Sequence, residues 1–136
     1  MNNDVILRIY VHIVNVYEVA GEEATARMIL FDGYCRCPLF GGNILPGAAD
    51  TQTQYKTGET ALSARYILEG MDENGENCKI FIENNAFAKP GERMITKPRI
   101  YTDSEHLKWL ETAELYGEIE GSGNDIIILI KDAGMI

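Results

Sequence analysis

Three polar residues near the middle of the chain could act together on a small molecule. Asp50 follows the turn at Pro46-Gly47, and in an extended strand it shares a face with Gln52. If the strand of Asp50 pairs with the strand of Arg65 across a turn at Gly58, the two side chains stand about opposite each other. A buried carboxylate has a raised pKa and can act as a general base. The spacing therefore makes Asp50 and Arg65 candidate catalytic residues, joined by an ion pair either inside the fold or, alternatively, on its surface.

Simpler roles remain open for each of these side chains. Asp50 can cap its turn or face solvent. Asn84 could line the mouth of a pocket, but it could also begin a loop. Tyr66 follows Arg65, and because neighbours in a strand point to opposite faces, only one of these two can face inward unless a bulge intervenes. The candidate ligand-binding residues are Asp50, Gln52, Arg65, Tyr66 and Asn84.

Other kinds of site lack the residues that they require. A metal site needs three or four ligands, whereas the two histidines, His12 and His106, and the three cysteines show no recognised spacing. The chain has no Gly-x-Ser-x-Gly, no Gly-x-Gly-x-x-Gly and no P-loop. We therefore expect no metal and no cofactor.

Composition and charge restrict the class of protein. The 136 residues are 46% hydrophobic and 24% charged, which is typical of a single globular domain over residues 1–136. A net charge of -9 repels phosphate groups, so we expect neither nucleic acid nor membrane as a partner. The odd number of cysteines favours a reducing compartment. The first apolar run is interrupted by Arg8 and His12, whereas the apolar region of a signal peptide is continuous. We expect a cytoplasmic protein.

Apolar residues recur with period two along most of the chain, which predicts strands. Asn74-Gly75 predicts a hairpin with a type I′ turn, the glycine- and proline-rich residues 38–47 are expected to be irregular, and Ser104 could cap one short helical turn near 104–110. The pattern predicts an all-β fold, an antiparallel up-and-down β-barrel of about eight or nine strands. The expected strands cover residues 6–16, 25–34, 50–56, 61–69, 78–84, 93–101, 112–120 and 125–131.

Some of these strands are apolar on both faces, as in Ile126-Ile127-Ile128-Leu129-Ile130. One face fills the barrel, and the other would leave an apolar patch on a monomer. We therefore expect a homodimer or a higher homo-oligomer.

Four short motifs occur in a characteristic order. They are Gly42-Asn43-Ile44-Leu45-Pro46-Gly47-Ala48-Ala49-Asp50-Thr51-Gln52, Ala64-Arg65-Tyr66, Ile80-Phe81-Ile82-Glu83-Asn84 and Lys108-Trp109-Leu110. In this the chain resembles, over residues 5–131, the bacterial and fungal proteins of domain of unknown function 3237, also called uncharacterised protein family 0311. The resemblance implies a small, lipocalin-like β-barrel found as oligomers, and it implies no particular activity. Thr51 stands where the family pattern has tryptophan, and Ala48 where it has glycine.

Three functions are compatible with these features. The first is binding of a small, largely apolar molecule inside the barrel, oriented by a few polar residues. The second is a cofactor-free isomerase or cyclase, with Asp50 as base, Arg65 stabilising an enolate-like charge, and Tyr66 or His106 as proton donor. The third is a structural oligomer whose barrel is filled by its own side chains.

Overall fold

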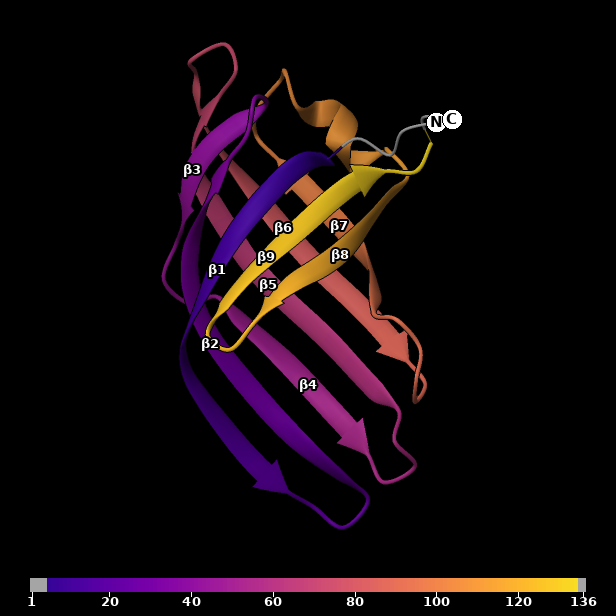
Figure 1. Ribbon diagram of the computed structural model, residues 1–136. Helices are drawn as coiled ribbons and strands as arrows, with labels where there is room; N and C mark the ends of the chain where they lie inside the picture. Colours follow the sequence, from indigo (N-terminus) through magenta and orange to yellow (C-terminus); the bar gives the residue numbers. More distant parts are fainter. Residues whose placement is uncertain (1–4, 135–136) are drawn as a thin grey trace.

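The computed structural model describes residues 5–134, which form one closed antiparallel β-barrel (Figure 1). The first strand, β1, pairs with β2 on one side and with β9 on the other, so the sheet closes on itself. Both β3 and β4 pair with β2 on one side and with β5 on the other, at different heights along the same position in the wall. The nine strands therefore fill eight positions. The predicted fold is confirmed. The strands are β1 Val5–Ala20, β2 Ala24–Arg36, β3 Phe40–Ile44, β4 Ala49–Tyr55, β5 Thr60–Asp72, β6 Asn77–Ala88, β7 Ile95–Thr102, β8 Leu115–Ser122 and β9 Asp125–Asp132.

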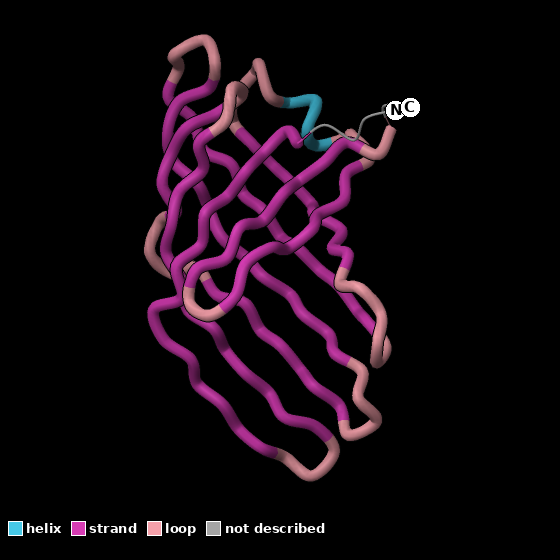
Figure 2. Tube along the Cα trace, viewed as in Figure 1, coloured by secondary structure: helices cyan, strands magenta, loops and turns pink. Residues whose placement is uncertain are grey.

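A short helical turn closes one end of the barrel. It is the 3₁₀ turn η1, Lys108–Glu111, and it is the only helical element in residues 5–134. The backbone N–H of Leu107 donates a hydrogen bond of 3.2 Å to Ser104 Oγ, so Ser104 caps the turn just before η1, while the N-cap position of η1 is Leu107. Leu110 within η1 and Leu107 just before it are both buried in the core. Figure 2 shows this turn at the upper end of the barrel.

One expected loop contains a strand. Residues 38–47 were expected to be irregular, but Phe40–Ile44 forms β3, which pairs with β2 and with β5. Gly42 lies opposite Gly70 of β5. The two glycines let these backbones approach closely, because a Cβ on Gly42 would lie 2.5 Å from the carbonyl oxygen of Glu69.

The hairpin expected at Asn74-Gly75 connects β5 to β6, but its turn is of another type. A type I′ turn needs positive φ at both central residues, and no non-glycine residue among 5–134 has positive φ. Instead the N–H of Gly75 donates to the carbonyl oxygen of Asp72 at 2.9 Å, and Gly75 itself has φ of +78°. This is the three-residue loop in which a glycine in the left-handed conformation follows a type I turn.

The end opposite η1 is open because neighbouring strands differ in length. β1 pairs with β9 only from Val5 to His12, whereas its pairing with β2 extends to Ala20. As a result β1, β2 and β4 continue beyond the tip of the β8–β9 hairpin (Figure 1). The inner face of this extension forms a mouth that leads into the barrel.

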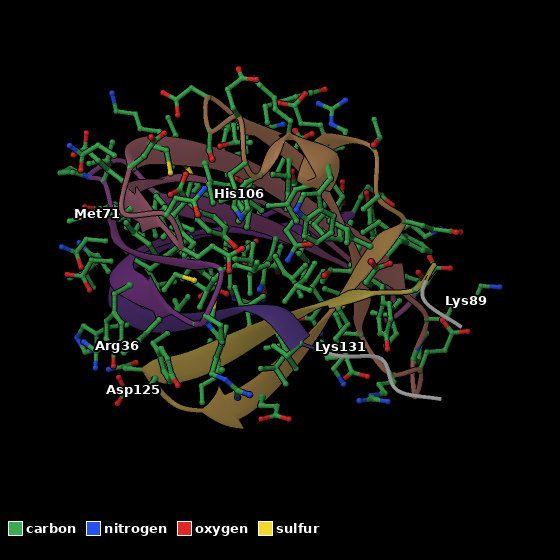
Figure 3. The ribbon with its side chains drawn as sticks, turned by 90° about the horizontal axis from the view of Figure 1, so that it is seen from above. Arg36, Met71, Lys89, His106, Asp125 and Lys131 are labelled. Atoms are coloured by element: carbon green, nitrogen blue, oxygen red, sulfur yellow. The ribbon has the colours of Figure 1, made fainter. Side chains whose placement is uncertain are left out.

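Alternate side chains of each strand fill the barrel between its ends. Figure 3 looks along the barrel from the η1 end and shows the charged side chains of Arg36, Lys89 and Asp125 at the periphery. No helix within residues 5–134 is long and apolar enough to cross a membrane. The most completely buried side chains include Leu7, Ile9, Phe40, Leu68, Ile80, Ile82, Leu107 and Ile130.

Candidate functional site

A cavity of about 110 Å³ lies at the open end of the barrel. Its wall is apolar except for one carboxylate and one amide, those of Asp50 and Gln52. An apolar cavity with a few polar groups is the usual form of a small-molecule site. The lining residues are Val11, Ile13, Ile29, Phe31, Asp50, Gln52, Ala64, Ile119, Ile126 and Ile128.

The register of three strands places Asp50 on the inner face. Asp50 of β4 lies opposite Ile29 of β2 and opposite Ala64 of β5. Residues opposite one another in a sheet point to the same side, and Ala64 is 6% exposed in the core. Because Ala64 is small, space remains beside the carboxylate. Gln52 follows two residues later on the same face.

The carboxylate of Asp50 is only partly satisfied. Gln52 Nε2 donates a hydrogen bond of 2.9 Å to Asp50 Oδ2. Asp50 Oδ1 is buried and has no hydrogen-bond partner. Burial disfavours the charged form and raises the pKa of Asp50, and the hydrogen bond from Gln52 offsets only part of this effect. A group that donates to Oδ1 would complete the site.

A second polar group lies at the mouth. Arg27 of β2 is the cross-strand neighbour of Gln52. Its guanidinium group forms an ion pair with Glu18 at 2.9 Å and donates to Gln54 Oε1 at 3.3 Å. The charge of Arg27 is therefore balanced at the mouth by Glu18.

The predicted pairing of Asp50 with Arg65 does not form. Arg65 lies opposite Ala49, and the inward neighbour of Asp50 is Ala64. A shift of one residue in register moves a side chain to the other face of a sheet, so Arg65 points outward. Its Nε atom donates to Glu83 Oε2 at 2.8 Å, and its side chain is 62% exposed. Arg65 does form a surface ion pair across strands, but its partner is Glu83, so neither the interior nor the surface form of the predicted Asp50–Arg65 pair is present.

Tyr66 and Asn84 face inward but do not line the cavity. Tyr66 is 3% exposed and packs edge-on against Phe31, with ring centroids 5.5 Å apart. Burial raises the pKa of Tyr66. Asn84 lies opposite Ala64 within β6 and does not begin a loop. The Tyr66 hydroxyl and Asn84 Oδ1 are buried without hydrogen-bond partners.

Neither histidine lies in the cavity wall. His106 is hydrogen-bonded to Glu73 at the η1 end of the barrel, and His12 to Asp125 at 3.0 Å on the outer surface. No cluster of three potential metal ligands occurs within residues 5–134. The isoleucines of the cavity wall were not predicted as site residues from the sequence. Their period-two spacing is the signal that could have placed them on the inner face.

Replacing Asp50 with asparagine is expected to stabilise the protein at pH 7 by on the order of 1 kcal/mol, because the variant buries no charge. The folded-state pKa of Asp50 is raised, so its protonated form contributes stability that is lost as pH rises through that pKa. The gain should therefore vanish below the ordinary pKa of 3.8. Urea denaturation of both proteins across pH 3–8 measures it. The matched control is Asp32→Asn, which removes a charge from the exposed face of β2. If Asp50→Asn is no more stable than the wild-type protein at pH 7, the buried, charged state assigned to Asp50 is wrong.

Comparison with protein-family models and with curated proteins finds no match to the chain in either. Solved structures share its fold. A protein of unknown function from Clostridium acetobutylicum is 21% identical, with a TM-score of 0.82 over 97% of this chain and 96% of that one. A β-barrel-like protein from Acinetobacter baumannii is 17% identical, with a TM-score of 0.78 over 95% and 93%. An enzyme from Penicillium herquei is 15% identical, with a TM-score of 0.71 over 95% and 92%. At these identities the chain is similar to them in fold.

Proposed function

We propose that this barrel binds a small, largely apolar molecule in the cavity beside Asp50. The observation that carries the proposal is the buried, unpartnered Oδ1 atom of Asp50 in an otherwise apolar wall. Leaving a buried acceptor unsatisfied costs about 1–3 kcal/mol. A ligand that donates to this oxygen and fills the cavity recovers that cost and buries its own apolar surface.

The size of the cavity supports a ligand rather than a packed interior. An engineered apolar cavity of about 150 Å³ is known to bind benzene. The cavity here is about 110 Å³ and opens toward the mouth between β1, β2 and β4. It can hold one ring-sized group, with the rest of the molecule extending toward Arg27 and Glu18. A barrel filled entirely by its own side chains would leave no such space.

Ala64→Leu should weaken binding strongly, because the larger side chain occupies the cavity beside Asp50. We expect benzyl alcohol, titrated into the ¹⁵N-labelled protein, to shift backbone resonances of cavity-lining residues such as Ile29 and Ile128. Affinity should fall by at least about tenfold in Ala64→Leu, since most of the buried ligand surface is lost. The matched control is Ala61→Leu, which changes the outer face of the same strand. Equal binding to wild type and Ala64→Leu, or no binding at all, contradicts the proposal.

An enzymatic role is the second candidate. It is supported by the raised pKa of Asp50, which suits a general base, and by the fold shared with a Penicillium herquei protein described as an enzyme. In this role Asp50 removes a proton next to a carbonyl group. Arg65 cannot stabilise the resulting charge from the outer face, so Gln52 is the nearest polar group that could. Asp50-dependent deuterium exchange into a small cyclic ketone tests this role, and exchange that persists in Asp50→Asn excludes it.

We further propose that the protein is a homodimer formed along the free edge of β1. The last contact of β1 on this side is the hydrogen bond from the Ile13 N–H to the Asn124 carbonyl oxygen at 2.8 Å, so beyond it one edge of residues 14–20 has no neighbouring strand. Val14, Tyr17 and Val19 are 58%, 57% and 70% exposed there. Such edges pair with other strands, and two antiparallel copies of one edge are related by a two-fold axis. A mass of 15.2 kDa by light scattering at micromolar concentration would contradict the dimer.

We propose that the chain is a divergent, lipocalin-like member of the domain of unknown function 3237 family. The ordered motifs around Asp50, Arg65 and Asn84 support this assignment, as does a barrel with one open end. The cysteines Cys35, Cys37 and Cys78 are free thiols, which is compatible with a cytoplasmic location.

A further inference from the structure

The two polar groups in the cavity both offer hydrogen-bond acceptors. A carboxylate can only accept, so the contact between Gln52 and Asp50 fixes the amide orientation, with Nε2 directed at Asp50 Oδ2. Asp50 Oδ1 has no partner, and the carbonyl oxygen of Gln52 belongs to the same amide group beside it. A ligand head group that reaches Asp50 Oδ1 must therefore donate a hydrogen bond, and a head group with further donors can also use the Gln52 carbonyl, while the amide has one N–H left to donate.

From this geometry we infer that the ligand is a primary amine, bound as its ammonium ion, on a ring or short hydrocarbon body. The inference rests on the proposed function of the cavity and names its ligand class. An ammonium group carries three donors, enough for Asp50 Oδ1 and the Gln52 carbonyl together. A hydroxyl group carries one donor and leaves one of the two acceptors without a partner.

Charge favours the same head group. The cavity wall contains one carboxylate and no basic side chain, so an anionic head group inside it would face the Asp50 carboxylate without a cation beside it. A hydrogen bond between ionised groups is about twice as strong as one between neutral groups, and burial of the pair reduces competition from water. The net charge of -9 also raises the local concentration of cations around the protein.

The charged groups closest to this cavity in the strand register do not reverse the preference. On β2, Arg27 is paired with Glu18 of β1 at 2.9 Å and so carries its own counter-ion. On β5 the residue opposite Asp50 is Ala64, and β8 and β9 contribute only isoleucines to the lining. The carboxylate of Asp50 is thus the charge that a ligand inside the cavity meets.

Four ring compounds of similar size test the inference, because they differ mainly in the head group. They are ethylbenzene, benzyl alcohol, benzylamine and benzoate, each titrated at pH 7 by calorimetry and by NMR. We expect benzylamine to bind at least about tenfold more tightly than benzyl alcohol, as befits a charge-assisted hydrogen bond, and benzoate to bind least. In Asp50→Asn the preference for benzylamine over benzyl alcohol should disappear. Ethylbenzene should still bind to this variant, and its binding would show that the cavity is intact. Asp32→Asn, which removes a charge outside the barrel, should keep the preference for benzylamine.

The outcomes separate the two claims. If benzyl alcohol binds as tightly as benzylamine, or if the preference for benzylamine survives in Asp50→Asn, the amine assignment is wrong and the binding function stands. If none of the four compounds shifts the resonances of cavity residues, the proposed function itself fails. Tight binding of benzoate would also overturn the amine assignment, because it would require a cationic group in the cavity.

Discussion

Gly70→Ala is expected to destabilise the protein by about 3 kcal/mol or more, a magnitude reached by severe overpacking. A Cβ at this position would lie 2.0 Å from the carbonyl oxygen of Gly41 and 2.5 Å from the Cα of Gly42. Both contacts are with backbone, which cannot rotate away as a side chain could. The clash would separate β3 from β5 and disturb the segment that leads to Asp50 on β4. Urea denaturation measures the loss.

Gly41→Ala is the matched control for this prediction. Gly41 is the neighbour of Gly42 in the same strand, yet a Cβ there would have Cys35 as its nearest contact, with the carbonyl oxygen 4.0 Å away. Its backbone has no positive φ that would strain an alanine. We expect a change within about 0.5 kcal/mol, typical of surface substitutions. If Gly70→Ala proves as mild as Gly41→Ala, the close approach of β3 and β5 is not as described.

The sequence predicted the barrel well because period-two patterns persist through most strands. It could not predict β3, since Phe40–Ile44 contains Gly41 and Gly42 and lacks a strand-like apolar pattern. That segment becomes a strand because β2 and β5 supply hydrogen-bonding edges on both sides of it. Pairing of this kind joins residues far apart in sequence, and local propensity carries little information about it.

At the candidate site, too, the sequence could not predict which residues of neighbouring strands lie opposite each other, and the error was one residue. Counting outward from Gly58 placed Arg65 opposite Asp50, and the actual partner is Ala64. The strands begin after the turn with Gln54 opposite Thr60, and that register puts Arg65 on the outer face. Asp50 and Gln52 were correctly grouped on one face, because their relationship depends only on alternation within a strand. The cavity arises from the small size of Ala64 and from the unequal lengths of β1 and β9, which no local pattern encodes.

Glu18→Pro is expected to convert the proposed dimer to a monomer while leaving the barrel folded. The N–H of Gly21 donates to the carbonyl oxygen of Ala24, so alternation along the hairpin directs the backbone groups of Val19 and Tyr17 toward β2. Those of Glu18 point to the free edge. Proline at Glu18 therefore removes an N–H that the monomer does not use, and proline is tolerated on edge strands.

Dimerisation should weaken by about a hundredfold, because two symmetry-related hydrogen bonds are lost and the proline rings keep the second strand away. Glu18→Gln is the matched control: it loses the ion pair with Arg27 but keeps the backbone N–H, so it should remain dimeric. Val19→Pro should instead unfold the hairpin, since its N–H bonds to β2. Sedimentation velocity and circular dichroism distinguish these cases. A Glu18→Pro protein that is folded and still dimeric would contradict an interface along β1 and would favour another surface, such as the outer face where Ile67, Phe81 and Tyr101 line a hollow rimmed by charged side chains.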